Sequence, residues 1–250
     1  MKIMHKTVFG QWGRLITGLM ALCLASQAMA GITLARTRVV YPLSQTDVSL
    51  QLNNDRPAPS LAQAWIDEGD PNSTPADSKA PFFITPSIFR MEPKSSQMLR
   101  IVYTGQSLPE NRESLFWLNV LDVPPNAKNV ADRLQFAFRT RIKLFVRPAG
   151  LNGSVKESLG QLRWKAVSAS TPGQSTMRVT NPSPYYLSFS EFDVQNQGQA
   201  LRNEQGGMVA PFSTAILSLT GQKPLQPGAK VNYKAIGDLG EALPGTATLH

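Results

Sequence analysis

The stretch LQFAFRTRIKLFVRP, residues 134–148, sorts its apolar and charged side chains onto alternate positions. One parity holds Leu134, Phe136, Phe138, Ile142, Leu144 and Val146, and the other holds Gln135, Arg139, Arg141, Lys143 and Arg147. Because successive strand residues point to opposite faces, this period of two predicts an extended strand with one apolar and one basic face. At about 3.3 Å per residue it would run roughly 50 Å, well beyond the usual five or six residues. A role beyond closing a sheet is therefore expected.

The apolar face of this strand allows two interpretations. Leu134, Phe136 and Phe138 either face the core of a sandwich or form an exposed row, which would mark a partner site. Phe145 lies on the basic parity, which indicates that part of the strand is covered on both faces.

Two cations stand in apolar surroundings, since Arg38 precedes Val39-Val40 and Lys143 lies between Ile142 and Leu144. Such a charge either reaches water through its long side chain or meets an anion, because burial alone costs several kcal/mol. Three other charges, Glu113, Arg147 and Asp238, are not paired by their spacing. Taken from the residues alone they are solvated surface charges.

The first thirty residues have the pattern of a secretory signal peptide. Lys2, Lys6 and Arg14 precede an apolar run at 15–25 that is about half the length of a membrane span. Ala28-Met29-Ala30 supplies a small-x-small cleavage signature, so we expect cleavage near Ala30/Gly31, export to the periplasm and no stable membrane insertion.

Several function classes are excluded by what the exported chain lacks. The only cysteine of the full chain, Cys23, lies in the signal segment. Of the two histidines, His5 also lies in that segment and His250 is the last residue. No Cys/His nucleophile, Ser-His-Asp triad or His/Cys metal cluster can be assembled, and no cofactor is implied. A carboxylate pair remains formally open to an enzyme.

The net charge narrows the class of partner. The whole chain has 25 basic and 17 acidic residues and a net charge of +8. Cleavage of the signal segment removes three basic residues and no acidic one, which leaves a net charge of +5. Export argues against nucleic acid as the partner, whereas an anionic protein terminus or an electronegative exported partner fits both the charge and the compartment.

Short extended segments and turn signals follow Gly31, which predicts an all-β protein and, for the first half, an immunoglobulin-like sandwich. The first series of strands is expected at 33–41, 47–52, 61–67, 82–84, 98–103, 113–122 and 134–147. After the break at Pro148-Ala149-Gly150 a second series is expected at 163–167, 176–180, 185–194, 208–219 and 230–236. The expected domains are therefore 1–30 (signal), 31–148 and 149–250. No helix of convincing amphipathic pattern is expected.

Six motifs in order give a family resemblance over nearly the whole exported chain. They are RTRVVY (36–41), LAQAW (61–65), RESLFWLN (112–119), VPP (123–125), IKLFVRP (142–148) and NPSPYY (181–186). Together they resemble the PapD-like periplasmic chaperones of the chaperone–usher pilus pathway. The resemblance implies two immunoglobulin-like domains in an L-shaped arrangement.

The resemblance also implies residue roles and partners. Arg38 and Lys143 would bind the C-terminal carboxylate of a pilus subunit, and Leu134, Phe136 and Phe138 would be inserted into the groove of a subunit that lacks its final strand. Glu113, Arg147 and Asp238 would form interdomain ion pairs. The implied function is to stabilise newly exported subunits by donor-strand complementation and deliver them to an outer-membrane usher, without catalysis.

Departures within the family and competing functions complete the expectations. The short connection after Pro125 and the absence of a cysteine pair place the chain with the short-loop class. The sequence does not indicate which subunits bind, or whether the free protein covers its strand by self-association. A structural subunit of a surface appendage is the second hypothesis, which a second domain and the lack of cysteine disfavour. An enzyme is the third.

Overall fold

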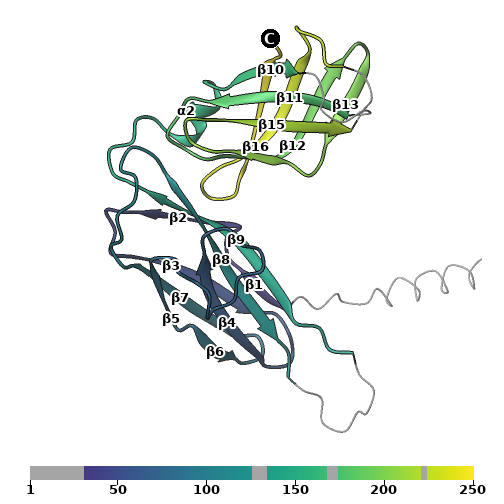
Figure 1. The fold of residues 1–250 in the computed structure, drawn as a ribbon. Coiled ribbons are helices and arrows are strands. Elements are labelled where there is room, and N and C mark those ends of the chain that lie inside the picture. The colour runs from purple at the N-terminus through teal and green to yellow at the C-terminus, as the bar shows by residue number, and fades with distance from the viewer. Residues whose placement is uncertain (1–30, 126–133, 168–173, 221–223) are drawn as a thin grey trace, which may run out of the picture. The chain divides into compact units, whose positions relative to one another are not determined.

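The computed structural model describes residues 31–125, 134–167, 174–220 and 224–250. The expected signal segment lies outside these residues. The regular secondary structure of the described chain consists of β-strands, as expected, and one short helix (Figure 1). Two hydrophobic cores form, one from residues between Ile32 and Val146 and the other from residues between Val155 and Leu249.

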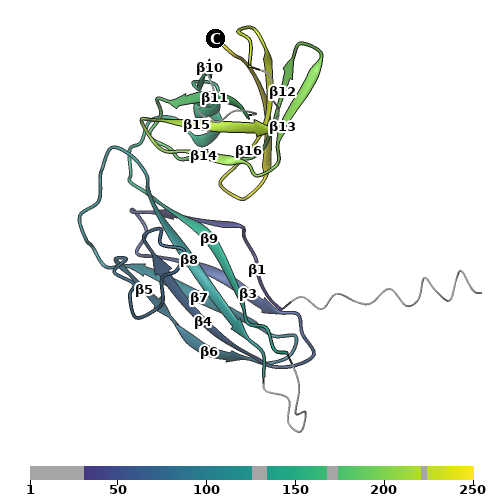
Figure 2. The ribbon, with the colours of Figure 1, turned by 45° about the vertical axis from the view of Figure 1, so that its right-hand side comes forward.

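The first core lies between two sheets. One sheet has the order β1-β3-β7-β5 and the other β2-β9-β8-β4-β6. Figure 2 shows β4, β8 and β9 side by side in the second sheet. The strands are β1 Ile32–Leu34, β2 Arg38–Pro42, β3 Asp47–Asn54, β4 Ser60–Asp67, β5 Phe82–Thr85, β6 Ile88–Met91, β7 Ser96–Tyr103, β8 Ser114–Val123 and β9 Phe138–Arg147.

The strand expected at 33–41 is two strands in different sheets. β1 pairs antiparallel with β3, whereas β2 pairs parallel with β9. The buried residue of β1 is Ile32, and those of β2 include Val39 and Tyr41, so the buried parity changes between them. Since one straight strand keeps a single parity on each face, the chain has to bend at 35–37 to bury both sets.

The long strand is shorter than the alternation predicts. β9 begins at Phe138, whose partner Asp122 lies at the end of β8. Residues 134–137 belong to no strand and are exposed. Alternation continues before Phe138, but no described strand offers those residues a backbone ladder.

The second core is lined by eight strands of order β10-β11-β15-β13-β12-β16-β17, with β14 on β12, in which a single residue pair joins β13 to β15. The elements are α2 Val155–Leu159, β10 Arg163–Val167, β11 Gln174–Asn181, β12 Leu187–Asn196, β13 Gln199–Asn203, β14 Gly207–Val209, β15 Ser213–Thr220, β16 Lys230–Ile236 and β17 Ala242–Thr248. Trp164 stacks on Tyr233 at a centroid distance of 5.4 Å inside this core.

Three features of this half differ from expectation. α2 was not predicted, although Ser154 caps it by accepting from Glu157 N and Ser-x-x-Glu is a known helix start. The strand expected at 208–219 is divided into β14 and β15 by Pro211 and by Phe212, whose φ is +51°. β13 and β17 were also missed, because their residues lack a continuous apolar alternation.

Candidate binding site at the open edge of β9

The first half of β9 has a free backbone edge. On one side β9 pairs with β8 along its whole length, from Asp122↔Phe138 to Ser114↔Val146. On the other side β2 covers only the second half, from Arg38↔Lys143 to Pro42↔Arg147. Within the described ranges no strand covers residues 138–142 on that side. An unpaired edge of this kind is a template for an added strand.

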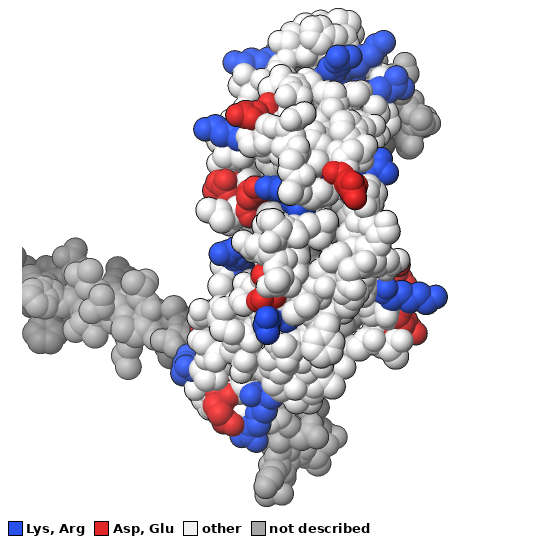
Figure 3. All heavy atoms as spheres, turned by 90° about the vertical axis from the view of Figure 1, so that its left-hand side faces the viewer, with Lys and Arg blue, Asp and Glu red and all other residues white. Residues whose placement is uncertain are grey.

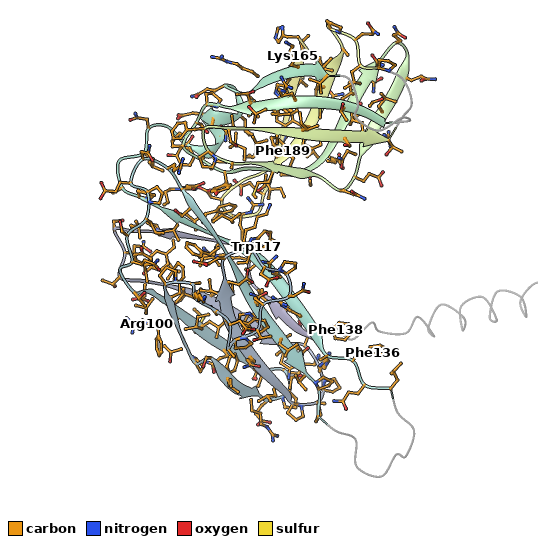
Figure 4. All side chains as sticks on the ribbon, in the orientation of Figure 1. Arg100, Trp117, Phe136, Phe138, Lys165 and Phe189 are labelled. Atoms are coloured by element: carbon orange, nitrogen blue, oxygen red, sulfur yellow. The ribbon has the colours of Figure 1, made fainter. Side chains whose placement is uncertain are left out.

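The apolar side chains before and at the start of β9 are exposed. Leu134 is 77% exposed and Phe136 and Phe138 are each 58% exposed, whereas Leu144 on the same parity is fully buried. Figure 4 labels Phe136 and Phe138 where the chain enters β9; their ring centroids are 6.5 Å apart. The interpretation that these three residues face the sandwich core is therefore wrong, because the core ends near Ile142.

Phe145 lies on the other parity and is also buried, at 3% exposure. Its ring packs against Tyr186, with centroids 5.8 Å apart, and against the guanidinium of Arg38 at 5.6 Å. The expectation that this part of the strand is covered on both faces is confirmed.

Arg38 and Lys143 are direct cross-strand partners beside the end of the open edge. Arg38 is only 6% exposed, so it does not extend to solvent; its Nη1 donates to the Ile236 carbonyl at 3.0 Å. Its Nε is buried and has no hydrogen-bond partner. Lys143 Nζ donates to Ser188 Oγ at 3.0 Å and lies 5.8 Å from the Trp117 ring centre.

The electrostatics of this pair favour an anion. Burial lowers the pKa of Lys143 to about 8, and the neighbouring charge of Arg38 adds to the shift. Burial also lowers the pKa of Arg38, with the more distant Asp238, Glu241 and Glu113 opposing the shift. Neither cation forms an ion pair with a carboxylate of the described chain. A bound carboxylate would supply the missing countercharge and accept charge-assisted hydrogen bonds.

Arg147 joins residues of the two halves of the chain. Its Nε donates to Glu113 Oε1 at 2.7 Å, and its Nη1 and Nη2 donate to the two oxygens of Asp238 at 2.7 and 2.8 Å. Glu113 Oε2 accepts from the Tyr186 backbone N–H at 2.8 Å. Burial raises the pKa of Glu113 although Arg147 acts against that shift. These contacts connect the start of β8 and the end of β9 to the turn after β16 and to the residue before β12.

Replacing Glu113 should cost far more stability than replacing Asp238. The Glu113 side chain is 1% exposed and that of Asp238 is 40% exposed. We expect Glu113→Ala to lower the free energy of unfolding by about 3 kcal/mol, and Asp238→Asn by about 1 kcal/mol or less. Urea unfolding of the two variants and the wild type measures this difference. Equal losses would show that solvent exposure does not decide the strength of these ion pairs.

Residues that contact the cations were not all foreseen. Ser188 and the Ile236 carbonyl come from β12 and β16, and nothing in their local sequence marks them as partners of Lys143 and Arg38. Trp117 lies in the RESLFWLN motif, but the sequence does not indicate that its ring contacts Lys143. Tyr186 lies in the NPSPYY motif, and its contact with Phe145 is visible only in the structure.

Other kinds of site find no support in the parts of the chain that the structure describes. They contain no cluster of three or more potential metal ligands and no helix long and apolar enough to cross a bilayer. On the face drawn in Figure 3, basic and acidic side chains are interspersed among uncharged ones. On that face no broad area of one sign appears.

Fold and site define a two-domain immunoglobulin-like protein with an open strand edge that ends at two cations, the buried Arg38 and the half-buried Lys143. Residues 31–152 match the N-terminal domain model of PapD, described as a pili and flagellar-assembly chaperone, and residues 157–247 match the model of the C-terminal domain of the pili assembly chaperone PapD. The chain belongs to the PapD family of pilus-assembly chaperones.

Individual relatives agree with this assignment. The probable fimbrial chaperone YadV of Escherichia coli is 41% identical over 91% of this chain and 94% of its own length. The crystal structure of YadV chaperone has a TM-score of 0.76 and covers 88% of this chain and 100% of that one. A Salmonella enterica SafB chaperone, solved in complex with the SafA pilin, is 28% identical, with a TM-score of 0.70 and coverage of 90% and 99%. The appendage-subunit hypothesis is thereby replaced by the chaperone family.

Proposed function

We propose that this chaperone binds newly exported pilus subunits along the open edge of β9, anchors their C-terminal carboxylate at Arg38 and Lys143, and passes them to an outer-membrane usher. The observation that carries the proposal is that the free edge ends at Arg38, which is buried, and Lys143, which is half-buried, and neither forms an ion pair with a described carboxylate. The SafB chaperone, a relative, is recorded in complex with a pilin.

The direction of the bound strand follows from the geometry. β2 runs parallel to β9 and begins at Arg38, directly beside Lys143. A strand added to residues 138–142 with its carboxylate at these cations therefore runs in the same direction as β9 and ends where β2 begins. The edge from Phe138 to Lys143 spans about 17 Å at the usual rise per residue. Carboxylate binding thus fixes the register of the backbone ladder.

The apolar row contributes the second part of the interaction. The side chains of Leu134, Phe136 and Phe138 are already exposed in the free chaperone. Their burial in a groove would contribute roughly 5–9 kcal/mol before ordering costs. The backbone ladder would supply affinity for any extended segment, and these side chains would select the groove that fits them.

Family and sequence also support a location and a mode of release. Fimbrial chaperones of this family are periplasmic, and we propose that residues 1–30 direct export and are removed near Ala30/Gly31. We propose a non-enzymatic role, in which a subunit leaves when another strand replaces β9 in its groove.

Co-expression with neighbouring pilus subunits tests the proposed function directly. The tagged chaperone should recover at least one exported subunit in a one-to-one complex from the periplasmic fraction, and that subunit should be degraded or aggregated when the chaperone is absent. Recovery of no subunit, with each subunit equally abundant without the chaperone, would reject the function.

Affinity for a carboxylate should fall above pH 8. The probe is a synthetic peptide that alternates apolar and polar residues and ends in a free carboxylate, here called the free-acid peptide. Because burial holds the pKa of free Lys143 at about 8, binding above that pH requires proton uptake. We expect calorimetry to show a dissociation constant that is flat below pH 7 and rises by up to about tenfold per pH unit above 8.

The free energy of unfolding of the free chaperone should rise with pH between 8 and 10.5, whereas the affinity for the peptide falls. The pKa of Lys143 falls from 10.5 to about 8 on folding, so its burial penalty is present below pH 8 and is relieved as the pH rises from 8 to 10.5.

Lys143→Arg, which stays charged, is the control for the binding experiment and should remove the pH dependence of peptide binding. If the dissociation constant of the variant rises with pH as steeply as that of the wild type, the titrating group is not Lys143.

A further inference from the structure

The basic face of β9 is packed against aromatic and polar side chains and is not a solvated face. We name the set the arginine ladder: Trp65 and Asp67 of β4, Trp117 and Asn119 of β8, and Arg139 and Arg141 of β9. In the register of the sheet, Asp67 is opposite Trp117 and Asn119 is opposite Arg141. The ladder therefore crosses three neighbouring strands.

Arg141 is held by a buried carboxylate and an aromatic ring. Its Nη2 and Nε donate to the two oxygens of Asp67 at 2.6 and 3.3 Å, and its guanidinium lies 4.2 Å from the Trp117 ring centre. Asp67 is 2% exposed and also accepts from Asn119 Nδ2 at 2.7 Å and from Gly69 N at 2.7 Å. These bonds lower the pKa of Asp67 against the effect of burial.

Arg139 repeats the arrangement one step earlier along β9. Its Nη2 and Nε donate to Asn119 Oδ1 at 2.7 and 2.9 Å, and its Nη1 donates to the Pro71 carbonyl at 2.8 Å. The guanidinium lies 4.7 Å from the Trp65 ring centre. Asn119 is fully buried and connects both arginines, since it accepts from Arg139 and donates to Asp67.

This part of β9 has little other support. On the opposite face Phe138 and Thr140 are exposed, because the core ends at Ile142. On the edge away from β8, residues 138–142 have no described partner. The strand is therefore held there by its ladder with β8 and by Arg139 and Arg141. Trp117 also lies beside Lys143, its direct partner in register, so the arginine ladder reaches the cation pair.

We propose that the arginine ladder is a positioning device that holds residues 138–142 extended before a subunit arrives. The inference rests on the proposed function, because it assigns the strand its bound conformation in the free chaperone. A strand ordered in advance pays less conformational entropy on binding, which raises affinity without any contact between the ladder and the subunit.

Hydrogen exchange and peptide binding on the full exported chain test the proposal together. The variants are Arg139→Gln, which leaves no buried charge unpaired, and Arg141→Lys, which keeps the charge facing Asp67 but loses the planar two-oxygen contact. The matched control is Arg100→Gln, because Arg100 also pairs with a strand carboxylate, Asp47, but is 58% exposed and lies in the other sheet.

We expect both variants to exchange amides of residues 138–142 faster while β3 and β7 keep wild-type protection. The free-acid peptide should bind about threefold to tenfold more weakly to them than to the wild type or the control. The double variant Arg139→Gln/Arg141→Lys should show the larger loss. Arg38→Ala, by contrast, should weaken binding and leave exchange at 138–142 unchanged.

Two results would overturn the inference. One is unchanged exchange at 138–142 in both variants, and the other is faster exchange there with wild-type affinity for the peptide. A uniform loss of protection in β3 and β7 as well would assign the ladder to global stability and also reject a positioning role. Failure of the wild type to bind either the peptide or a subunit would instead reject the proposed function, which separates the two cases.

Discussion

Arg38→Ala and Lys143→Ala should each abolish recovery of bound pilus subunits while the chaperone stays folded. Each cation would lose a charge-assisted hydrogen bond to the carboxylate, worth about 1.5–3 kcal/mol. The fold should survive, because neither cation has a carboxylate partner whose charge would be left unpaired. Co-purification with co-expressed subunits measures the loss, and circular dichroism measures folding. Lys165→Ala, at an exposed position of β10, is the control.

A peptide with an amidated C-terminus makes the assignment specific. The wild type should bind the amidated peptide about as weakly as the Lys143→Ala variant binds the free-acid peptide, and the variant should no longer distinguish the two peptides. Normal subunit recovery by both Ala variants, or equal wild-type binding of acid and amide, would contradict the carboxylate anchor.

The triple change Leu134→Ser, Phe136→Ser and Phe138→Ser should remove most stabilisation of subunits and leave the stability of the free chaperone almost unchanged. The side chains are 77%, 58% and 58% exposed, so folding gains little from them. Transfer into a groove would gain roughly 5–9 kcal/mol before ordering costs. Resistance of a co-expressed subunit to added protease, compared at equal chaperone levels, measures the effect.

Phe83→Ser is the matched control for this change. Phe83 is 62% exposed on β5, in the sheet that does not contain β9. It should leave subunit protection at the wild-type level. Equal protection by the triple variant would mean that the backbone edge alone completes the subunit, and comparable losses in Phe83→Ser would mean that exposed aromatic residues act without regard to position.

The predictable part of the site is the part that a strand's own periodicity controls. Alternation placed Ile142, Leu144 and Val146 on one face and Lys143 on the other, as observed. The same alternation continues to Leu134 and does not indicate that the strand begins only at Phe138 and the core only at Ile142. The end of β8 and the limit of the opposing sheet decide that point, and neither is encoded in residues 134–148.

The basic parity of β9 shows the same limit. Arg139, Arg141, Lys143 and Arg147 are equivalent in the alternating pattern, yet their polar partners differ. Arg139 and Arg141 pack on tryptophans, Lys143 meets Ser188, and Arg147 binds Glu113 and Asp238. Local sequence specifies which face a charge lies on, whereas its partner comes from strands distant in the chain.

By itself, the sequence determined the class of fold, the family and the residues that could form an anion site, because periodicity and ordered motifs are local properties of the chain. Only the tertiary structure decided that β2 stops covering β9 at Arg38, so that an open edge ends at two cations without a countercharge. Burial, strand pairing and the pKa of Lys143 all depend on which segments meet in space. These tertiary contacts make the alternating stretch at residues 134–148 a candidate donor strand.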